Sequence, residues 1–276
     1  MIYIGCHLSV SDGFEAMGKK MCSFGGNTFA YFTRNPRGGK TKPMIAEDVE
    51  ALQLLMERER FGPLVAHGSY TMNLCSTNEV TRANGLDMLQ KDLARMEAFP
   101  GNYYNFHPGA HTGQGIETGV ELIASALNQV LHPELQTTVL LETMTGKGTE
   151  IGGTFEELRA IIDRIHCSDK VGICFDTCHT WDAGYDLVKD LDGVLRHFDD
   201  VIGLERLKAV HLNDSKNVCG SHKDRHEKLG QGMIGLETIR RIVRHPAFEG
   251  IPFILETPND DAGYQKEIYL LKEICM

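Results

Sequence analysis

Histidine and acidic residues stand at the ends of short apolar segments throughout this sequence. In the stretch KVGICFDTCHTWDAGYD, an apolar run ends on Asp176, and His179 follows three residues later. Six further apolar runs end in the same way, on or beside a titratable residue: His7, His67, His107, Glu142, His211 and Glu256. Acids and imidazoles crowded together repel or desolvate one another unless a positive group lies among them. If these ends meet in the fold, the sequence predicts bound metal ions.

Two loop segments add further candidate ligands. His179 follows Asp176, and Asp224 and His226 flank Arg225, where an extended backbone would point both side chains the same way. One tetrahedral ion takes at most four protein ligands, so this many candidates predicts two or three ions with bridging carboxylates. Nitrogen and oxygen ligands without thiolate suit Zn²⁺, Mn²⁺ or Fe²⁺, and closely spaced ions are a recurrent device for hydrolysing phosphate esters. The nine candidates are His67, His107, Glu142, Asp176, His179, His211, Asp224, His226 and Glu256.

A repeated strand–helix unit would bring these residues together. Apolar runs recur with longer segments of helical spacing between them, which is the pattern of a (β/α)8 TIM barrel over residues 1–276 as a single domain. Barrel enzymes build their sites at the carboxyl ends of the strands, which is where the titratable residues stand. A doubly wound open sheet is the alternative fold. The runs cover residues 2–7, 28–33, 62–67, 102–107, 137–142, 171–176, 207–212 and 251–256.

Three of the intervening segments have a clear helical pattern. Apolar residues share one face of residues 46–61 and of residues 185–203. The segment 152–165 opens with Thr154 as the expected N-cap and Glu157 three residues on, which is the pattern of a capping box.

Composition restricts the environment and the class of partner. The eight cysteines include no CxxC pair, which predicts free thiols in a reducing cytoplasm rather than a disulfide scaffold. No apolar run is long enough to span a membrane, and the first residues lack the features of a signal peptide, so we expect a cytoplasmic protein without a membrane partner. The formal net charge of −10 argues mildly against a polyanionic partner, although bound metal would neutralise several carboxylates.

The remaining histidines and the one tryptophan have different expected roles. We expect His7 and His111 to lie behind the metal ligands and orient them, and Trp181 to anchor a loop. His222 is equally compatible with the rim of the site or with solvent. Four histidines in or near helices are expected to be structural: His132, His166, His197 and His245.

Several of these motifs together resemble the endonuclease IV family, the zinc-dependent apurinic/apyrimidinic endonucleases of DNA base-excision repair. The similarity covers most of the chain, and FDTCHTWDAGYD and the DRH segment are highly specific. The matching motifs are FHPGAH (106–111), LLETMTGKGTEIGGTFEEL (140–158), FDTCHTWDAGYD (175–186), HLNDSK (211–216), KDRHEKLGQGMIG (223–235) and FILETP (253–258).

The resemblance implies a barrel with three zinc ions and a defined reaction. One ion would be held by His67, His107 and Glu142, a second by Glu142, Asp176, His211 and Glu256, and a third by His179, Asp224 and His226. The family cleaves double-stranded DNA on the 5′ side of an abasic site, leaving a 3′-hydroxyl and a 5′-deoxyribose phosphate, and trims blocked 3′ ends. A water made acidic by the metals attacks the phosphorus, and we expect Glu142, Asp176 and Glu256 to be the catalytic carboxylates.

The resemblance also identifies loop residues that would grip damaged DNA. Arg37 and Tyr70 match an arginine and a tyrosine that relatives insert into the DNA, whereas Thr71 replaces a bulky aliphatic residue and Gly38 leaves its loop slim. We also expect Asn35, Lys216 and Arg225 to contact DNA, and a basic rim would carry the phosphate track. The rim residues are Arg34, Arg37, Lys40, Lys42, Lys147, Lys216, Lys223 and Arg225.

Two other functions fit parts of the same pattern. Metal-dependent sugar isomerases and epimerases of the xylose isomerase-like superfamily share the barrel mouth but usually need fewer ligands. A non-catalytic zinc-stabilised binding protein would have closed coordination, which carboxylate-rich sites rarely show. The trio His179, Asp224 and His226 favours the endonuclease, for which no obligate protein partner is evident.

Overall fold

Parallel strands close into a barrel in the computed structural model, which describes residues 2–39 and 41–275. Going round the barrel, the strand order is β1-β10-β7-β6-β5-β4-β3-β2, and every neighbouring pair is parallel. This closure confirms the predicted (β/α)8 architecture and excludes the open sheet. The barrel strands are β1 (Tyr3–Leu8), β2 (Ala30–Phe32), β3 (Val65–His67), β4 (Tyr103–Phe106), β5 (Thr138–Glu142), β6 (Val171–Asp176), β7 (Leu207–His211) and β10 (Pro252–Leu255).

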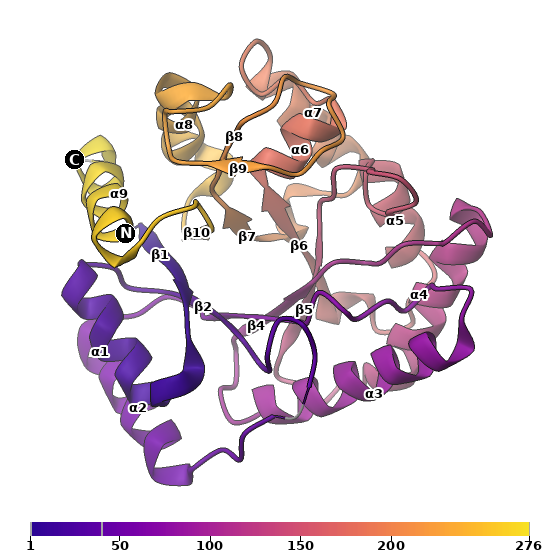
Figure 1. The fold of residues 1–276 in the computed structure, drawn as a ribbon, viewed down its shortest axis with the longest axis horizontal. Coiled ribbons are helices and arrows are strands. Elements are labelled where there is room, and N and C mark those ends of the chain that lie inside the picture. Colours follow the sequence, from indigo (N-terminus) through magenta and orange to yellow (C-terminus); the bar gives the residue numbers. More distant parts are fainter. Residues whose placement is uncertain (1, 40, 276) are drawn as a thin grey trace.

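Helices surround the barrel, and Figure 1 shows them as an outer layer around the strands. The last helix, α9, lies beside the start of β1 at the left of this view. Lys20 of α1 pairs with Asp261 of α9 at 2.8 Å. This ion pair joins the first helix to the last. The helices are α1 (Phe14–Phe24), α2 (Ala46–Glu59), α3 (Glu79–Met96), α4 (Ile116–Val130), α5 (Phe155–Ile162), α6 (Thr177–Ala183), α7 (Leu191–Val201), α8 (Gly235–Arg244) and α9 (Asp261–Cys275).

Alternation along the strands divides the core into two layers. The odd-numbered residues of β6, such as Ile173 and Phe175, pack outward against the helices, whereas Cys174 belongs to a separate inner cluster. Successive strand residues point to opposite faces, so the residue two positions after an inner one also faces inward. All of the inner residues except Ala30, which precedes Phe32, therefore stand two positions before a predicted site residue. The inner cluster is Ala30, Val65, Leu140, Cys174, Ala209 and Ile254.

Two of the predicted elements differ from the structure in extent or type. The expected helix over 185–203 begins only at Leu191, because the Asp190 carboxylate accepts the Gly193 amide and caps the helix there. Thr154 caps α5 as expected by accepting the Glu157 amide at 3.2 Å. The Glu157 carboxylate, however, accepts the amides of Gly152 and Gly153 instead of returning to Thr154.

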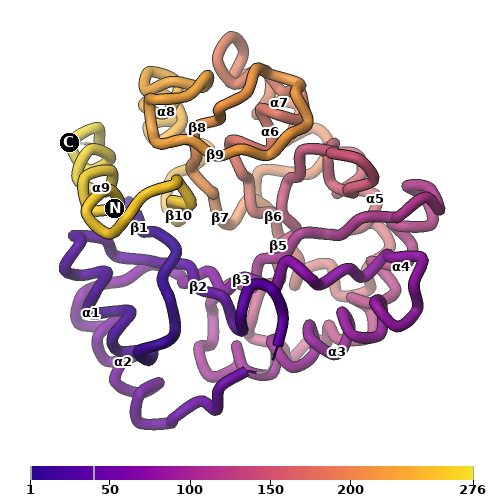
Figure 2. The backbone as a smooth tube through the Cα atoms, viewed as in Figure 1, coloured from indigo at the N-terminus to yellow at the C-terminus, as the bar shows by residue number. Residues whose placement is uncertain are grey.

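A small hairpin-like pair lies over the barrel mouth. Strands β8 (Asp214–Ser215) and β9 (His226–Glu227) pair antiparallel, and the tube in Figure 2 shows the loop that joins them lying beside α6. The loop therefore returns His226 to the strand ends. Within residues 2–39 and 41–275, no helix is long and apolar enough to cross a membrane, and all eight cysteines are free thiols.

Candidate metal centre at the barrel mouth

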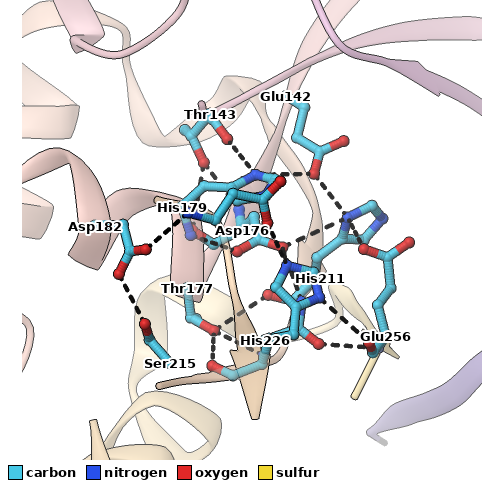
Figure 3. Close-up of polar contacts among 12 residues, drawn as sticks. Glu142, Thr143, Asp176, Thr177, His179, Asp182, His211, Ser215, His226 and Glu256 are labelled. Carbon is cyan, nitrogen blue, oxygen red and sulfur yellow. Dashed lines mark hydrogen bonds and ion pairs between the residues drawn. The ribbon is translucent and has the colours of Figure 1, made fainter. Parts of the chain in front are cut away.

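The strand ends bring histidine and acidic side chains together at one mouth of the barrel. Ligand atoms within 4.8 Å of one another form overlapping groups, and Figure 3 shows several of these side chains pointing toward a common centre. The sheet register contributes directly, because Asp176 lies beside His211 on the neighbouring strand. The groups are His67–His211–Glu256, His67–His107–Glu142, Asp176–His179–His226 and Glu142–Asp176–His211–Glu256.

Glu142 lies at the centre of this cluster, fully buried. Its Oε2 atom faces the Nε2 atoms of His67 and His107, at 3.3 and 3.5 Å. Its Oε1 atom faces the Nδ1 atoms of His211 and His179, at 3.0 and 3.3 Å. The two oxygens of the Glu142 carboxylate therefore face two different sets of imidazoles, which is the arrangement of a bridging ligand.

Backbone carbonyls fix the tautomer of three imidazoles, including His179, whose Nδ1 atom also faces Glu142 Oε1. His67 Nδ1 lies 2.7 Å from Gly68 O, His179 Nδ1 lies 3.0 Å from Thr143 O, and His226 Nδ1 lies 3.2 Å from Glu256 O. A carbonyl can only accept, so Nδ1 carries the hydrogen in each ring and Nε2 keeps its lone pair. A hydrogen bond of this kind fixes the tautomer and orientation of a metal-binding imidazole.

His179 lies on a short helix, where the sequence suggests a loop. Asp176 ends β6 and serves as the N-cap of α6, because its Oδ1 atom accepts the His179 backbone N–H at 2.7 Å. An N-cap carboxylate bonds the amide three residues on, so the spacing of Asp176 and His179 is the spacing of a helix start. One hydrogen bond thereby fixes two candidate ligands relative to each other.

Asp224 and His226 approach His179 from the loop between β8 and β9. An Asp224 carboxylate oxygen lies 3.2 Å from His179 Nε2 and 3.6 Å from His226 Nε2. The expected extended backbone is wrong at Asp224, whose φ of 56° is left-handed. Asp tolerates this region better than most residues. The side chains converge because the loop turns here.

Burial and neighbouring charges shift the pKa values of the clustered residues in different directions. Burial opposes ionisation of Glu142, but the charge of His211 and hydrogen bonds from His179 and His211 hold the pKa of Glu142 well below its usual range. Burial lowers the pKa of His107 to about 4, so this imidazole is neutral at neutral pH. Burial likewise raises the pKa of Asp176, and a cation nearby would reverse that effect.

Bound cations would satisfy groups that otherwise lack partners. Among the described residues, His226 Nε2 is buried without a hydrogen-bond partner, and it faces Asp176 Oδ2 and Asp224 Oδ1 at 3.6 Å each. His211 Nδ1 lies within 3.1 Å of both Glu142 and Glu256, two carboxylates that one proton cannot neutralise together. These nitrogen and oxygen donors fit Zn²⁺, which both imidazoles and carboxylates bind.

Two buried asparagines support the carboxylates and were not anticipated. Asn105 donates to Glu142 Oε2 at 2.6 Å, and Asn213 donates to Asp176 Oδ2 at 2.8 Å while its own oxygen accepts the Glu256 amide at 2.9 Å. Each asparagine stands two residues from a histidine of its strand segment, His107 or His211, and alternation therefore points them to the same face. That spacing is the signal that could have identified them.

The two histidines expected behind the ligands have different positions. His7 stacks on Phe32 with ring centroids 4.4 Å apart, and its Nε2 atom lies 3.5 Å from Glu256 Oε1. Burial lowers the pKa of His7 to about 3. His111 instead lies in the loop after β4, where its Nδ1 atom accepts the backbone amides of Gly113 and Gly115.

The loops expected to touch DNA pack against each other beside the mouth. Pro36 O accepts the Tyr70 amide at 2.9 Å, and Gly38 comes so close to Thr71 that a Cβ at Gly38 would lie 2.9 Å from Thr71 Oγ1. Asn35 shapes the turn, because its side-chain oxygen accepts the Arg37 amide at 2.9 Å. Arg37 and Tyr70 are exposed, and the Tyr70 ring rests edge-on against Phe32.

The expected basic rim is only partly at the surface. Arg34 is buried, not exposed, and its guanidinium pairs with the fully buried Asp92 at 2.5 Å, so it cannot meet DNA. Lys40 lies outside the described residues. The exposed members are Arg37, Lys42, Lys147, Lys216, Lys223 and Arg225. Trp181 is buried and anchors the β8–β9 loop through its indole N–H, which donates to Asn217 O at 2.8 Å.

Comparison with known proteins assigns the family. Residues 19–274 match the xylose isomerase-like TIM barrel family. A Probable endonuclease 4 of Alkaliphilus oremlandii (strain OhILAs) is 58% identical over 99% of this chain and 97% of its own length. The crystal structure of endonuclease IV from Thermus thermophilus superposes with a TM-score of 0.86 at 32% identity, over 98% of this chain and 99% of that one. A D-tagatose 3-epimerase-like protein, 19% identical with a TM-score of 0.73 over 99% of this chain and 97% of that one, shares the fold alone. The chain therefore belongs to the endonuclease IV family and is a nuclease built on a TIM barrel.

Proposed function

We propose that this nuclease repairs DNA by hydrolysing the phosphodiester on the 5′ side of an abasic site, leaving a 3′-hydroxyl and a 5′-deoxyribose phosphate, and that it also trims blocked 3′ ends. The observation that carries this proposal is the convergence of imidazoles and carboxylates at one mouth. It includes a third group in which His179 and His226 lie beside Asp176 and face an Asp224 oxygen at 3.2 and 3.6 Å. A sugar isomerase or epimerase needs one or two ions and would leave this third group unused.

The residues at the mouth fit three zinc ions, with Mn²⁺ or Fe²⁺ as an alternative at one of them. When bound, the ions act as Lewis acids that neutralise phosphate charge and acidify water. Glu142 would be shared between two ions, because its two oxygens face different imidazoles. The proposed ligands are His67, His107 and Glu142; Glu142, Asp176, His211 and Glu256; and His179, Asp224 and His226.

Glu256 is the carboxylate best placed to orient the attacking water. Its side chain is 12% exposed, whereas Glu142 and Asp176 are fully enclosed. His7 Nε2 lies on one side of this carboxylate and His211 Nδ1 on the other, at 3.5 and 3.1 Å. The charge of His211 and its hydrogen bond hold the pKa of Glu256 below its usual range against the opposing effect of burial. A charged carboxylate at the solvent edge can accept a proton from water.

Residues of the exposed loops would distinguish damaged duplex DNA from intact duplex DNA. Tyr70 is 56% exposed beside His107, with ring centroids 5.4 Å apart, so its ring can stack on a base step next to the flipped-out abasic nucleotide. Arg37 extends from the adjacent loop. Lys216 and Arg225 lie on the opposite loop, where they can contact phosphates. Because the eight thiols are free, we place the enzyme in the cytoplasm.

Incision of a duplex with a single abasic site, followed by analysis of both new ends, tests this proposal. We expect cleavage on the 5′ side only, loss of activity with a chelator, and recovery with zinc. Metal analysis of the pure protein should give close to three zinc ions per chain after reconstitution. Activity on a ketose sugar without incision of DNA would favour the epimerase class instead.

A further inference from the structure

The loop between β8 and β9 is attached to the last turn of α6 at several points. Trp181 donates from its indole to Asn217 O at 2.8 Å, and its own carbonyl accepts the Gly220 amide at 3.1 Å. The Asp182 carbonyl accepts the His222 amide at 2.9 Å. Two of these bonds end on carbonyls in the last turn of the helix, where the Trp181 carbonyl also accepts the Gly184 amide. The loop and α6 therefore form one unit.

The Asp182 side chain makes the remaining attachments. It is fully buried, and its carboxylate accepts from Ser215 Oγ at 2.7 Å, from Asn217 Nδ2 at 3.2 Å and from the Asp224 backbone N–H at 3.0 Å. Figure 3 shows Asp182 on the side of the cluster beyond His179, with Ser215 below it. One carboxylate therefore joins the strand β8, the start of the loop and the residue Asp224.

The contact with Asp224 bears on the metal centre. Asp224 has a left-handed backbone, with φ at 56°, and the Asp182 carboxylate binds the N–H of this turn. The N–H that Asp182 binds belongs to the same residue whose carboxylate lies 3.2 Å from His179 Nε2. Helix α6 thus presents His179 from its first turn and holds the partner of His179 from its last turn.

We propose that Asp182 is the positioning residue for the third metal ion, acting through Asp224 without touching the ion itself. This inference rests on the proposed three-ion function. The other two groups are built from strand ends whose orienting bonds come from Gly68, Asn105 and Asn213, so they do not depend on Asp182. Loss of Asp182 should selectively weaken the binding of one ion.

Three variants test the proposal. Asp182→Ala removes all three bonds, and Asp182→Asn keeps the size and one accepting oxygen. Asp186→Asn is the matched control, because it removes a nearby acid whose carboxylate binds Lys189 and not the loop. Orienting groups behind metal ligands are worth about 10- to 100-fold in metal affinity. In Asp182→Ala we expect one zinc ion to bind about that much more weakly, a smaller loss in Asp182→Asn, and no change in the control.

Two readouts separate this role from a general effect on folding. Zinc per chain, titrated at buffered free zinc, should fall by one ion in Asp182→Ala, and incision should recover when free zinc is raised. Trp181 is the only tryptophan and binds the same loop, so its emission should shift to longer wavelength and become more accessible to acrylamide. Equal weakening of all ions, or wild-type zinc binding with unchanged emission, overturns the proposal.

Failure of the proposed three-ion function can be told apart from failure of the proposed role of Asp182. A wild-type chain that holds fewer than three zinc ions contradicts the three-ion centre, whatever the variants do, because that count does not involve Asp182. The Trp181 emission still decides whether Asp182 holds the loop in that case.

Discussion

At the scale of single residues, the centre combines charged carboxylates with imidazoles of fixed tautomer. The carbonyls of Gly68, Thr143 and Glu256 each bind an Nδ1 atom, which leaves Nε2 for a metal. Glu142 and Asp176 are held by asparagine amides, which can donate without adding charge. Protein contacts therefore set the orientation of these proposed ligands, which reduces the cost of assembling the site.

Glu256→Gln should keep the fold and lose most of the activity. The change is nearly isosteric, but it removes the charge that faces His7 and His211 at the solvent edge. Groups that stabilise charge in the transition state contribute about two to three orders of magnitude in kcat. Steady-state incision of an abasic duplex by the metal-loaded variant measures the loss.

The matched control is Glu249→Gln. Glu249 is an exposed acid just before β10, whereas Glu256 follows the other end of the same strand. We expect wild-type kinetics for this control. A folded, zinc-loaded Glu256→Gln protein with near-normal kcat would reject the proposed role of Glu256.

At the scale of elements, short loops and helices carry the parts of the site that strands cannot supply. The loop after β2 is tied to the core by Arg34, which pairs with Asp92 of α3 and also donates to the carbonyls of Met88 and Gly39. Thr33 and Tyr104 donate to the same Asp92 carboxylate at 2.7 and 3.0 Å. This buried network holds the base of the loop that carries Arg37.

Asp92→Ala should destabilise the protein strongly. The substitution leaves the Arg34 guanidinium buried without its acid, and breaking a buried pair on one side typically costs about 3–5 kcal/mol. Asp87→Ala on the same helix removes an exposed pair with Lys91 at 2.7 Å, which is worth only about 0.3–0.5 kcal/mol. Urea unfolding of the two variants compares the losses directly. Equal losses would mean that the Arg34–Asp92 pair adds nothing to stability.

Arg37→Ala should weaken binding to abasic duplex more than to intact duplex. The exposed side chain stands beside Tyr70 on packed loops, where a displaced nucleotide would leave space for it. Fluorescence anisotropy with both duplexes at one salt concentration measures the two affinities. Arg58→Ala on the outer helix α2 serves as the control, because this exposed arginine pairs only with its neighbour Glu59 among the described residues. Equal losses on both duplexes would make Arg37 a general phosphate contact.

At the scale of the whole molecule, an acidic chain has to present a locally positive mouth. The net charge is −10, yet exposed basic residues gather on the loops after β2, β5 and β7, and bound divalent ions would add positive charge between them. Affinity for duplex DNA should therefore fall steeply with salt, with a logarithmic slope of about 0.9 for each phosphate contact. Titration across a salt series gives the slope. Salt-independent binding would place the DNA contact elsewhere.

Zinc retention should fall as the pH is lowered from neutral. An imidazole must be neutral to bind metal, so protons compete with zinc below the ordinary imidazole pKa of about 6.5. In the metal-free cluster, burial opposes the charged form, but Asp176 and hydrogen bonds to Asp224 and Glu142 raise the pKa of His179 well above that value. Proton competition should therefore begin above a pH of about 6.5 at this histidine. Zinc released to a colorimetric chelator as the buffer is taken from mildly alkaline to mildly acidic measures the effect.

The sequence by itself determined the barrel and the chemistry of its mouth. Strand-length apolar runs that alternate with helical segments indicated the closed sheet, and a titratable residue at a strand end had to face the same mouth as its neighbours. Alternation then fixes the direction of each side chain. Leu140 and Cys174 fill the barrel interior, so Glu142 and Asp176, two residues later on the same strands, also face inward. These features are local or periodic, and a single chain displays them directly.

Only the tertiary structure decided which imidazoles each carboxylate faces and which distant residues hold the site in place. Which imidazoles face each oxygen of Glu142 depends on strand order around the barrel, and the burial of Arg34 depends on Asp92, 58 residues away. The left-handed turn at Asp224 is stabilised by Asp182, 42 residues earlier in the chain. Contacts of such separation leave no periodic pattern in the sequence, because their geometry exists only once the barrel has closed.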